Sequence, residues 1–157
     1  MAVSTQAPTV ERIDHWTLVS SDIERTKRFF TEVLGAQSRD RGGAQGRGGA
    51  PGRGGGPVAV TLANTTIDFF EPNERQPKPS PGGEGQHHAY VIKYEDFDTW
   101  IERFRYFEVP LHFGQFGNRM SMMFDDPDGY HFEFTVPFED RGRARQELEQ
   151  RGLKFEN

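Results

Sequence analysis

The chain has 157 residues, of which 34% are hydrophobic and 13% aromatic, enough for one compact domain or two small modules that share a core. Its formal net charge of -5, from 19 basic and 24 acidic residues, argues against a general nucleic-acid binder, because phosphate recognition needs a basic surface. The chain has no Cys, no signal-peptide pattern in MAVSTQAPTV and no run of about 18 apolar residues, so we expect a cytoplasmic protein with no membrane partner.

The first predicted elements are a strand and a helix. In RIDHWTLV (12–19), Ile13, His15, Thr17 and Val19 share one face, opposite Trp16 and Leu18. Ser21 and Glu24 have the spacing of a capping box, which predicts a helix that starts at Ser21. Apolar residues then recur at helical spacing, and Gly35 is well placed to end the helix.

A glycine-rich segment interrupts the first half of the chain. Residues 42–56 contain nine Gly in fifteen positions, and such a segment buries too little surface to offset its ordering entropy. Its arginines resemble those of nucleic-acid-binding Arg-Gly segments, but the acidic protein favours a plain disordered insertion. Two strands follow it, VAVTL (58–62) and TIDFF (66–70), at hairpin spacing.

The second half repeats the order of the first. After a linker rich in Pro and Gly, HHAYVIKY predicts a strand, and Asp96 can cap a helix with an apolar stripe that ends near Pro110. Three further strands are predicted at 111–116, 119–124 and 130–136, and one short helix at 140–150. Each half therefore runs strand, helix, then two or three strands.

The repeat places chemically similar residues at corresponding positions. His15 and His87 open the first strand of each half, and Asp68 and Glu133 lie in the last. In DDPDGYHFEF, Glu133 shares a strand face with His131 and Thr135, opposite the aromatic face. A carboxylate withdrawn from water needs a partner or a metal ion, and imidazole with carboxylate suits a first-row divalent ion.

These residues carry a family resemblance. The run HWTLVSSDIERTKRFFTEVLGA, with the turn and strand DDPDGYHFEF, resembles the vicinal oxygen chelate superfamily, the glyoxalase, bleomycin-resistance and extradiol-dioxygenase group. The resemblance implies an α+β fold of paired βαβββ modules, whose curled mixed sheets form a metal-binding cleft, commonly in homodimers in which both chains build each site. It carries the metal ligands onto His15, His87 and Glu133, with Asp68 where four-ligand members have Glu.

The resemblance also divides the chain. The expected parts are a flexible N-terminus (1–11), a first module (12–72, with the disordered insertion 42–56), a linker (73–86), a second module (87–137) and a charged C-terminal tail (138–157). Three residues near the expected cleft are candidate acids or bases for catalysis: His112, Tyr130 and His131.

Three functions remain open on the sequence alone. The leading expectation is an Fe(II) extradiol-type dioxygenase, because three protein ligands leave positions for a catecholate-like substrate and dioxygen. Binding by Asp68 as well would favour a glyoxalase-like isomerase or lyase that uses Ni(II) or Zn(II), and Mn(II) is a further candidate ion. The third is a non-enzymatic protein that binds a small-molecule drug and confers resistance. The many Phe favour a small apolar or aromatic substrate.

Overall fold

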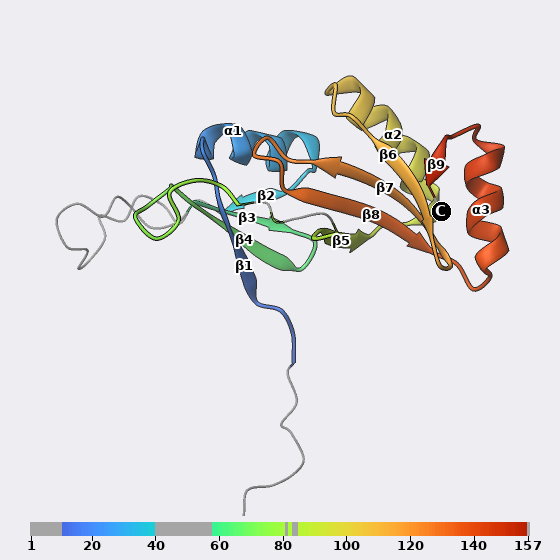
Figure 1. Cartoon of the computed structure of the whole chain (residues 1–157), viewed down its shortest axis with the longest axis horizontal. Coiled ribbons are helices and arrows are strands. Elements are labelled where there is room, and N and C mark those ends of the chain that lie inside the picture. Colours follow the sequence, from blue (N-terminus) through green and yellow to red (C-terminus); the bar gives the residue numbers. More distant parts are fainter. Residues whose placement is uncertain (1–10, 40–57, 81, 83–84, 157) are drawn as a thin grey trace, which may run out of the picture.

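The chain forms two mixed β-sheets with helices along one side of both (Figure 1). The structure is a computed structural model that describes residues 11–39, 58–80, 82 and 85–156. The first sheet has the strand order β1-β4-β3-β2, with β1 (His15–Val19), β2 (Gln37–Arg39), β3 (Val58–Leu62) and β4 (Thr65–Phe70). The predicted insertion at 42–56 lies outside the described residues.

The second sheet has the order β5-β8-β7-β6-β9. Its strands are β5 (His88–Val91), β6 (His112–Phe116), β7 (Arg119–Asp125), β8 (His131–Pro137) and β9 (Phe155–Glu156). The predicted α+β class with two mixed sheets is therefore confirmed, and neither sheet closes into a barrel.

Strand pairing confirms the internal repeat. In each half the first strand pairs in parallel with the last, β1 with β4 and β5 with β8. Asp68 lies opposite Thr17, two residues after His15, and Glu133 lies opposite Ala89, two residues after His87. The two carboxylates thus occupy the same position relative to the two histidines.

Helix α1 (Ile23–Arg28) continues into a π-helical turn at Phe29–Val33, and its start differs from the prediction. The N-cap is Asp22, whose side chain accepts a hydrogen bond from the backbone N–H of Arg25, so the predicted Ser21 capping box is wrong. The Ser21 hydroxyl instead donates to Asp128 in the β7–β8 turn. Gly35 has φ +70° just after the helix, as expected for the residue that ends it.

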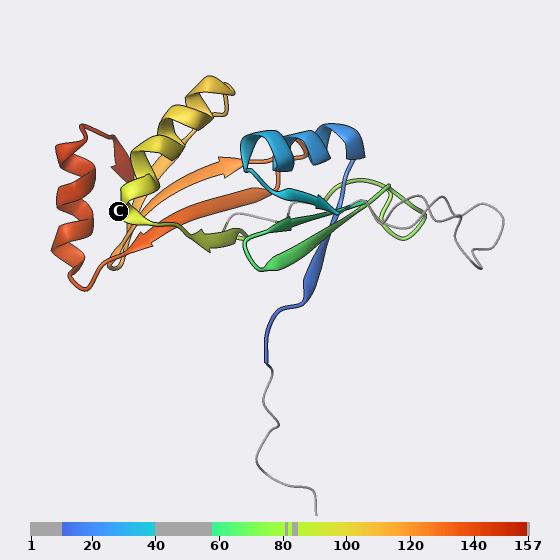
Figure 2. The ribbon, with the colours of Figure 1, turned by 180° about the vertical axis from the view of Figure 1, so that it is seen from behind.

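Helix α2 (Phe97–Tyr106) follows a 3₁₀ turn at Tyr94–Asp96. Asp96 precedes α2, but its side chain makes no capping hydrogen bond, contrary to the prediction. Figures 1 and 2 show α1 and α2 on the same side of the sheets. Phe30 contacts Phe69 and Phe132, one from each sheet, so a continuous aromatic core joins the two halves.

The C-terminal residues also pack on the second half. The predicted short helix is confirmed as α3 (Arg141–Gln150), with Ala144 and Leu148 fully buried. Strand β9 pairs with β6, and Arg151 binds Asp98 at the start of α2 at 2.8 Å. Among the described residues, no helix is long and apolar enough to cross a membrane.

Candidate metal centre

The face of each sheet turned away from α1 and α2 carries the candidate ligands. Cross-strand partners share a face, so Thr17, Asp68, Ala59 and Arg39 form one row on the open face of the first sheet. The corresponding row of the second sheet contains Ala89, Glu133, Met123 and His112. The predicted assignment of these carboxylates to the face opposite the aromatic core is therefore confirmed.

His87 and Glu133 are in direct contact. His87 Nε2 lies 2.9 Å from Glu133 Oε2, and the Glu133 side chain is 10% exposed. His87 precedes β5 instead of opening it, because the strand starts at His88. Its Nδ1 lies 3.2 Å from the backbone oxygen of Gly85. A neutral imidazole protonated at Nδ1 would donate to this oxygen and leave the Nε2 lone pair available to a metal ion.

The hydroxyl of Ser121 holds the other side of Glu133. Ser121 Oγ donates a short hydrogen bond to Glu133 Oε1 and lies 3.1 Å from Thr135 Oγ1. All three side chains lie on the open face of the second sheet, and all three residues are buried. Ser121 therefore fixes the orientation of the carboxylate. No sequence pattern marks Ser121 for this role, since it lies in the run RMSMMFD and only strand pairing brings it beside Glu133.

His15 and Asp68 line a separate pocket of about 490 Å³ in the first half. His15 Nδ1 lies 3.1 Å from Asp14 Oδ2, which leaves Nε2 free, and the side chain is 53% exposed. The contact with His15, together with the charge of Arg12, lowers the pKa of the Asp14 carboxyl. Asp68 is 8% exposed, and its Oδ1 is buried without a hydrogen-bond partner among the described residues.

The four candidate ligands thus form two pairs. Within the part of the chain that the structure describes, no group of three or more His, Asp or Glu side chains is placed to share a metal ion. We call His15 with Asp68 the first half-site, and His87 with Glu133 the second half-site. Each half-site offers one imidazole and one carboxylate, which is half of a complete ligand set for a divalent ion.

The three predicted acids or bases differ in their contacts. Tyr130 is buried, and its hydroxyl donates to the backbone oxygen of Val19 and accepts from the Ser80 N–H. His131 Nδ1 contacts Asp125 Oδ1 at 2.5 Å, and His131 lines a second pocket, of about 380 Å³, together with His87 and Thr17. His112 is exposed, on the same row as Glu133 with Met123 between them.

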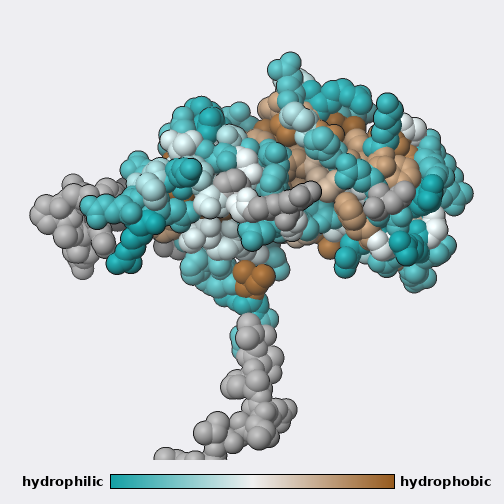
Figure 3. All heavy atoms as spheres, in the orientation of Figure 1, coloured by the Kyte–Doolittle hydropathy of each residue, from teal (hydrophilic) through white to brown (hydrophobic). Residues whose placement is uncertain are grey.

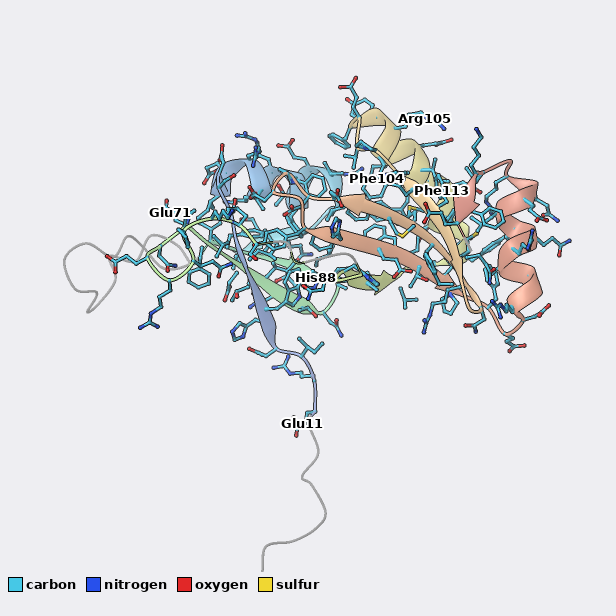
Figure 4. All side chains as sticks on the ribbon, in the orientation of Figure 1. Glu11, Glu71, His88, Phe104, Arg105 and Phe113 are labelled. Carbon is cyan, nitrogen blue, oxygen red and sulfur yellow. The ribbon has the colours of Figure 1, made fainter. Side chains whose placement is uncertain are left out.

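His88 packs against aromatic rings of the core and contacts neither carboxylate of the half-sites, although it borders the pocket that His87 and His131 line. Its ring stacks on Trp16 at 4.0 Å, where β1 and β5 approach each other (Figure 4). Burial, and secondarily the charge of His87, lowers the pKa of His88. The prediction that His87 and His88 face opposite sides is confirmed, so His88 serves as a junction residue between the two halves.

The carboxylate of Asp128 joins the two halves as well. It accepts hydrogen bonds from the Ser21 backbone N–H at 3.1 Å and from Arg25 Nη2 at 3.0 Å, besides the Ser21 hydroxyl. Burial alone would raise the pKa of the Asp128 carboxyl, but the hydrogen bonds that it accepts, chiefly those from Ser21, outweigh burial, so the pKa is lowered. The β7–β8 turn, which precedes the strand of Glu133, is thereby fixed to the start of α1.

Comparisons with known proteins agree with this architecture. The family model described as the Glyoxalase/Bleomycin resistance protein/Dioxygenase superfamily matches residues 12–134. The glutathione transferase FosA of Serratia marcescens is 23% identical over 127 residues, which cover 81% of this chain and 82% of that protein.

Solved structures show the same fold. The lactoylglutathione lyase of Agrobacterium tumefaciens has a TM-score of 0.57 and 22% identity, over 82% of this chain and 96% of that one. The fosfomycin resistance protein FosX of Mesorhizobium loti has a TM-score of 0.60 and 18% identity, over 83% and 98%. Since the family model spans most of the described structure, this chain belongs to the glyoxalase, bleomycin resistance protein and dioxygenase superfamily.

Proposed function

We propose that this protein is a metal-dependent enzyme that acts on a small molecule with neighbouring oxygen atoms, at a site completed by two copies of the chain. The observation that carries the proposal is the second half-site, in which Glu133 contacts His87 at 2.9 Å and is oriented by the buried Ser121. A carboxylate so fixed beside an imidazole, on an open sheet face, matches the donor chemistry of a divalent-metal site.

The residues of the first half-site fit a metal ion too. A buried carboxylate oxygen without a partner carries a large desolvation cost, and Asp68 Oδ1 is in this state. A divalent ion held jointly with His15 would compensate it. Because Asp68 faces the same pocket as His15, we propose all four residues as ligands: His15, Asp68, His87 and Glu133.

Exposed apolar side chains support a homodimer. In the part of the chain that the structure describes, most of the large hydrophobic side chains that remain exposed lie on the open faces of the two sheets or extend β1: Ile13, Phe70, Val91 and Phe116. A second copy would cover them while it brings the first half-site of one chain to the second half-site of the other.

Four ligands favour an isomerase or lyase over a dioxygenase. Two carboxylates offset the charge of a divalent ion and leave two coordination positions, enough for two substrate oxygens but not for dioxygen as well. The bound ion would polarise the substrate oxygens and stabilise negative charge that develops on them. We propose that His131, which contacts Asp125 and lines the pocket beside the second half-site, exchanges a proton with the substrate; these two contacts support the role.

The Fe(II) dioxygenase becomes the second candidate. The comparisons do not single it out, and it requires Asp68 to stay outside the ligand set. Ni(II) or Zn(II) would accord with the isomerase or lyase, and oxygen-sensitive Fe(II) with the dioxygenase. A protein that binds no Fe(II), Mn(II), Ni(II) or Zn(II) would instead accord with metal-free drug binding.

Two isosteric variants and a mixing experiment test the proposal. Metal affinity should fall sharply in both Asp68→Asn and Glu133→Gln, whereas loss in Glu133→Gln alone would favour the dioxygenase. An equimolar mixture of His15→Ala and Glu133→Gln chains, unfolded and refolded together, should regain about a quarter of the wild-type metal sites, since each mixed dimer restores one site. No recovery, with metal bound by the wild type, would contradict a site shared between chains.

A further inference from the structure

The pocket beside the first half-site contains a positively charged side chain, Arg39, which is not a proposed metal ligand. The pocket of about 490 Å³ has two arginines, Arg12 and Arg39, in its lining, together with Asp14, His15, Thr61 and Asp68. Arg12 Nη2 is paired with Asp14 Oδ1 at 3.1 Å, so its charge is matched locally. Within the described residues, Arg39 makes no hydrogen bond or ion pair, although it lines the same pocket.

Strand pairing explains why Arg39 lies beside the first half-site. Arg39 is opposite Ala59, and Ala59 is opposite Asp68, so all three side chains rise from the open face on one row. Ala59 is fully buried and offers only a methyl group between them. Arg39 is therefore two strands from a proposed metal ligand, and on this row only the methyl group of Ala59 lies between them.

A hydroxyl in the same pocket also lacks a partner. Thr61 Oγ1 is buried and makes no hydrogen bond among the described residues. Thr61 is opposite Thr66 and Gln37, on the row next to Arg39. A buried hydroxyl without a partner is costly, and this one can donate to a ligand oxygen that enters the pocket.

We propose that Arg39 and Thr61 form an anion subsite, which binds a carboxylate, phosphate or phosphonate group of the substrate beside the first half-site. A guanidinium presents two parallel N–H donors that match two oxygens of such a group, and the Thr61 hydroxyl supplies a third donor. The substrate class of the proposed enzyme is then an anion, which adds a charged group to the small apolar or aromatic molecule that the abundance of Phe suggested. This inference names the substrate class and so rests on the proposed function.

The charges of the pocket predict how anion and metal binding interact. Asp68 lines the same pocket as Arg39, with strand β3 between them, and its negative charge opposes an anion until a cation compensates it. A divalent ion held by His15 and Asp68 removes this opposition. Anion affinity should therefore rise when metal binds, and metal affinity should rise by the same factor when the anion is present.

Binding of phenylphosphonate, benzoate and benzyl alcohol to the full chain, with and without Zn(II), tests the subsite. Arg39→Gln should weaken binding of the preferred anion roughly ten- to a hundredfold, since a bidentate charge-assisted contact is lost. Arg39→Lys, which keeps the charge but not the two-pronged geometry, should fall in between. The matched control Arg105→Gln, on the exposed side of α2 (Figure 4), should bind like the wild type.

The three probe compounds distinguish which anionic group the subsite binds. Tighter binding of benzoate identifies a carboxylate subsite, tighter binding of phenylphosphonate identifies a phosphonate or phosphate subsite, and benzyl alcohol should not compete with either. The inference is overturned if neither anion binds, or if both bind Arg39→Gln as tightly as the wild type. Zn(II) titration of the same samples keeps the two proposals apart. A wild type that binds no metal contradicts the proposed function, while anion binding to the metal-free protein, sensitive to Arg39, would still support the subsite.

Discussion

Ser121→Ala tests whether the hydrogen bond from Ser121 orients Glu133 in the second half-site. Glu133 is a proposed metal ligand, whereas Ser121 is not. Ser121 is fully buried, and its hydroxyl donates to Glu133 Oε1. Removal of the hydroxyl leaves a buried carboxylate oxygen without this donor, which should lower the free energy of unfolding of the metal-free protein by about 2 kcal/mol. Metal affinity should fall roughly ten- to a hundredfold, because the carboxylate is no longer held in one orientation.

Two measurements on the same protein check these values. Urea unfolding in the presence of a chelator gives the change in stability, and competition with a chromophoric chelator gives the metal affinity. Thr135→Val is the matched control, since it removes a hydroxyl that contacts Ser121 at 3.1 Å but leaves the bond from Ser121 to Glu133. Its metal affinity should stay within about threefold of the wild type. Equal metal affinity for Ser121→Ala and the wild type would refute the idea that Ser121 orients Glu133.

Two further predictions concern stability. Burial raises the pKa of Asp126 from an ordinary 3.8 to about 6, so the fold favours the protonated carboxyl, and the wild type loses stability as the pH rises from about 4 to 6. Asp126→Asn should therefore be more stable than the wild type above pH 6, by up to about 3 kcal/mol, and equal to it below pH 4. Urea unfolding at pH 3.5 and 7.5 measures both differences, and a gain in stability that does not change with pH would contradict this prediction. Leu148→Ala, in α3, should lower the free energy of unfolding in urea by about 2 to 5 kcal/mol, because it opens a cavity at a fully buried position. The control Gln150→Ala, at an exposed position of the same helix, should leave it unchanged. A loss below about 1 kcal/mol for Leu148→Ala would show that α3 does not pack on the folded core.

The long elements could be predicted because their signals are local. Strand β3 begins and ends at the predicted residues, and α3 differs by one residue at its start. Strand β2 has only three residues, QSR, all exposed, so no apolar alternation marks it. Strand β9 has two residues and exists through pairing with the edge of β6, which no local pattern contains. Short edge strands were missed because tertiary contacts alone define them.

The start of α1 shows the same limit at a single residue. Ser21 and Asp22 are both good N-cap residues, and local preference does not separate them. The choice follows from Asp128, more than 100 residues away in the sequence, which accepts the hydroxyl proton and the backbone N–H of Ser21. Ser21 is thus engaged in joining the two halves, and Asp22 caps the helix.

The site shows where the repeat was informative and where it was not. Strand alternation and the repeat were sufficient to select two histidines and two carboxylates, and the register places both carboxylates at equivalent positions. Neither signal could reveal that Ser121 holds Glu133, or that Arg39 lines the same pocket as Asp68, because both relations depend on the order of the strands in the sheet. Ligand positions could be read from the sequence, but their immediate surroundings required the sheet.

Those surroundings make the two half-sites chemically unequal despite the repeat. Along the row of Asp68 the neighbours are a methyl group and a guanidinium, and along the row of Glu133 they are a thioether and an imidazole. The second sheet adds Phe116, whose ring lies against Gly114 on the open face. Figure 3 shows that, apart from this face, apolar surface also gathers around α2 in the same half of the molecule. If one half-site of each kind encloses the substrate, one wall can bind an anionic group while the other contacts apolar atoms. The repeat thus supplies the metal ligands, whereas the differences between the halves determine which substrate can bind.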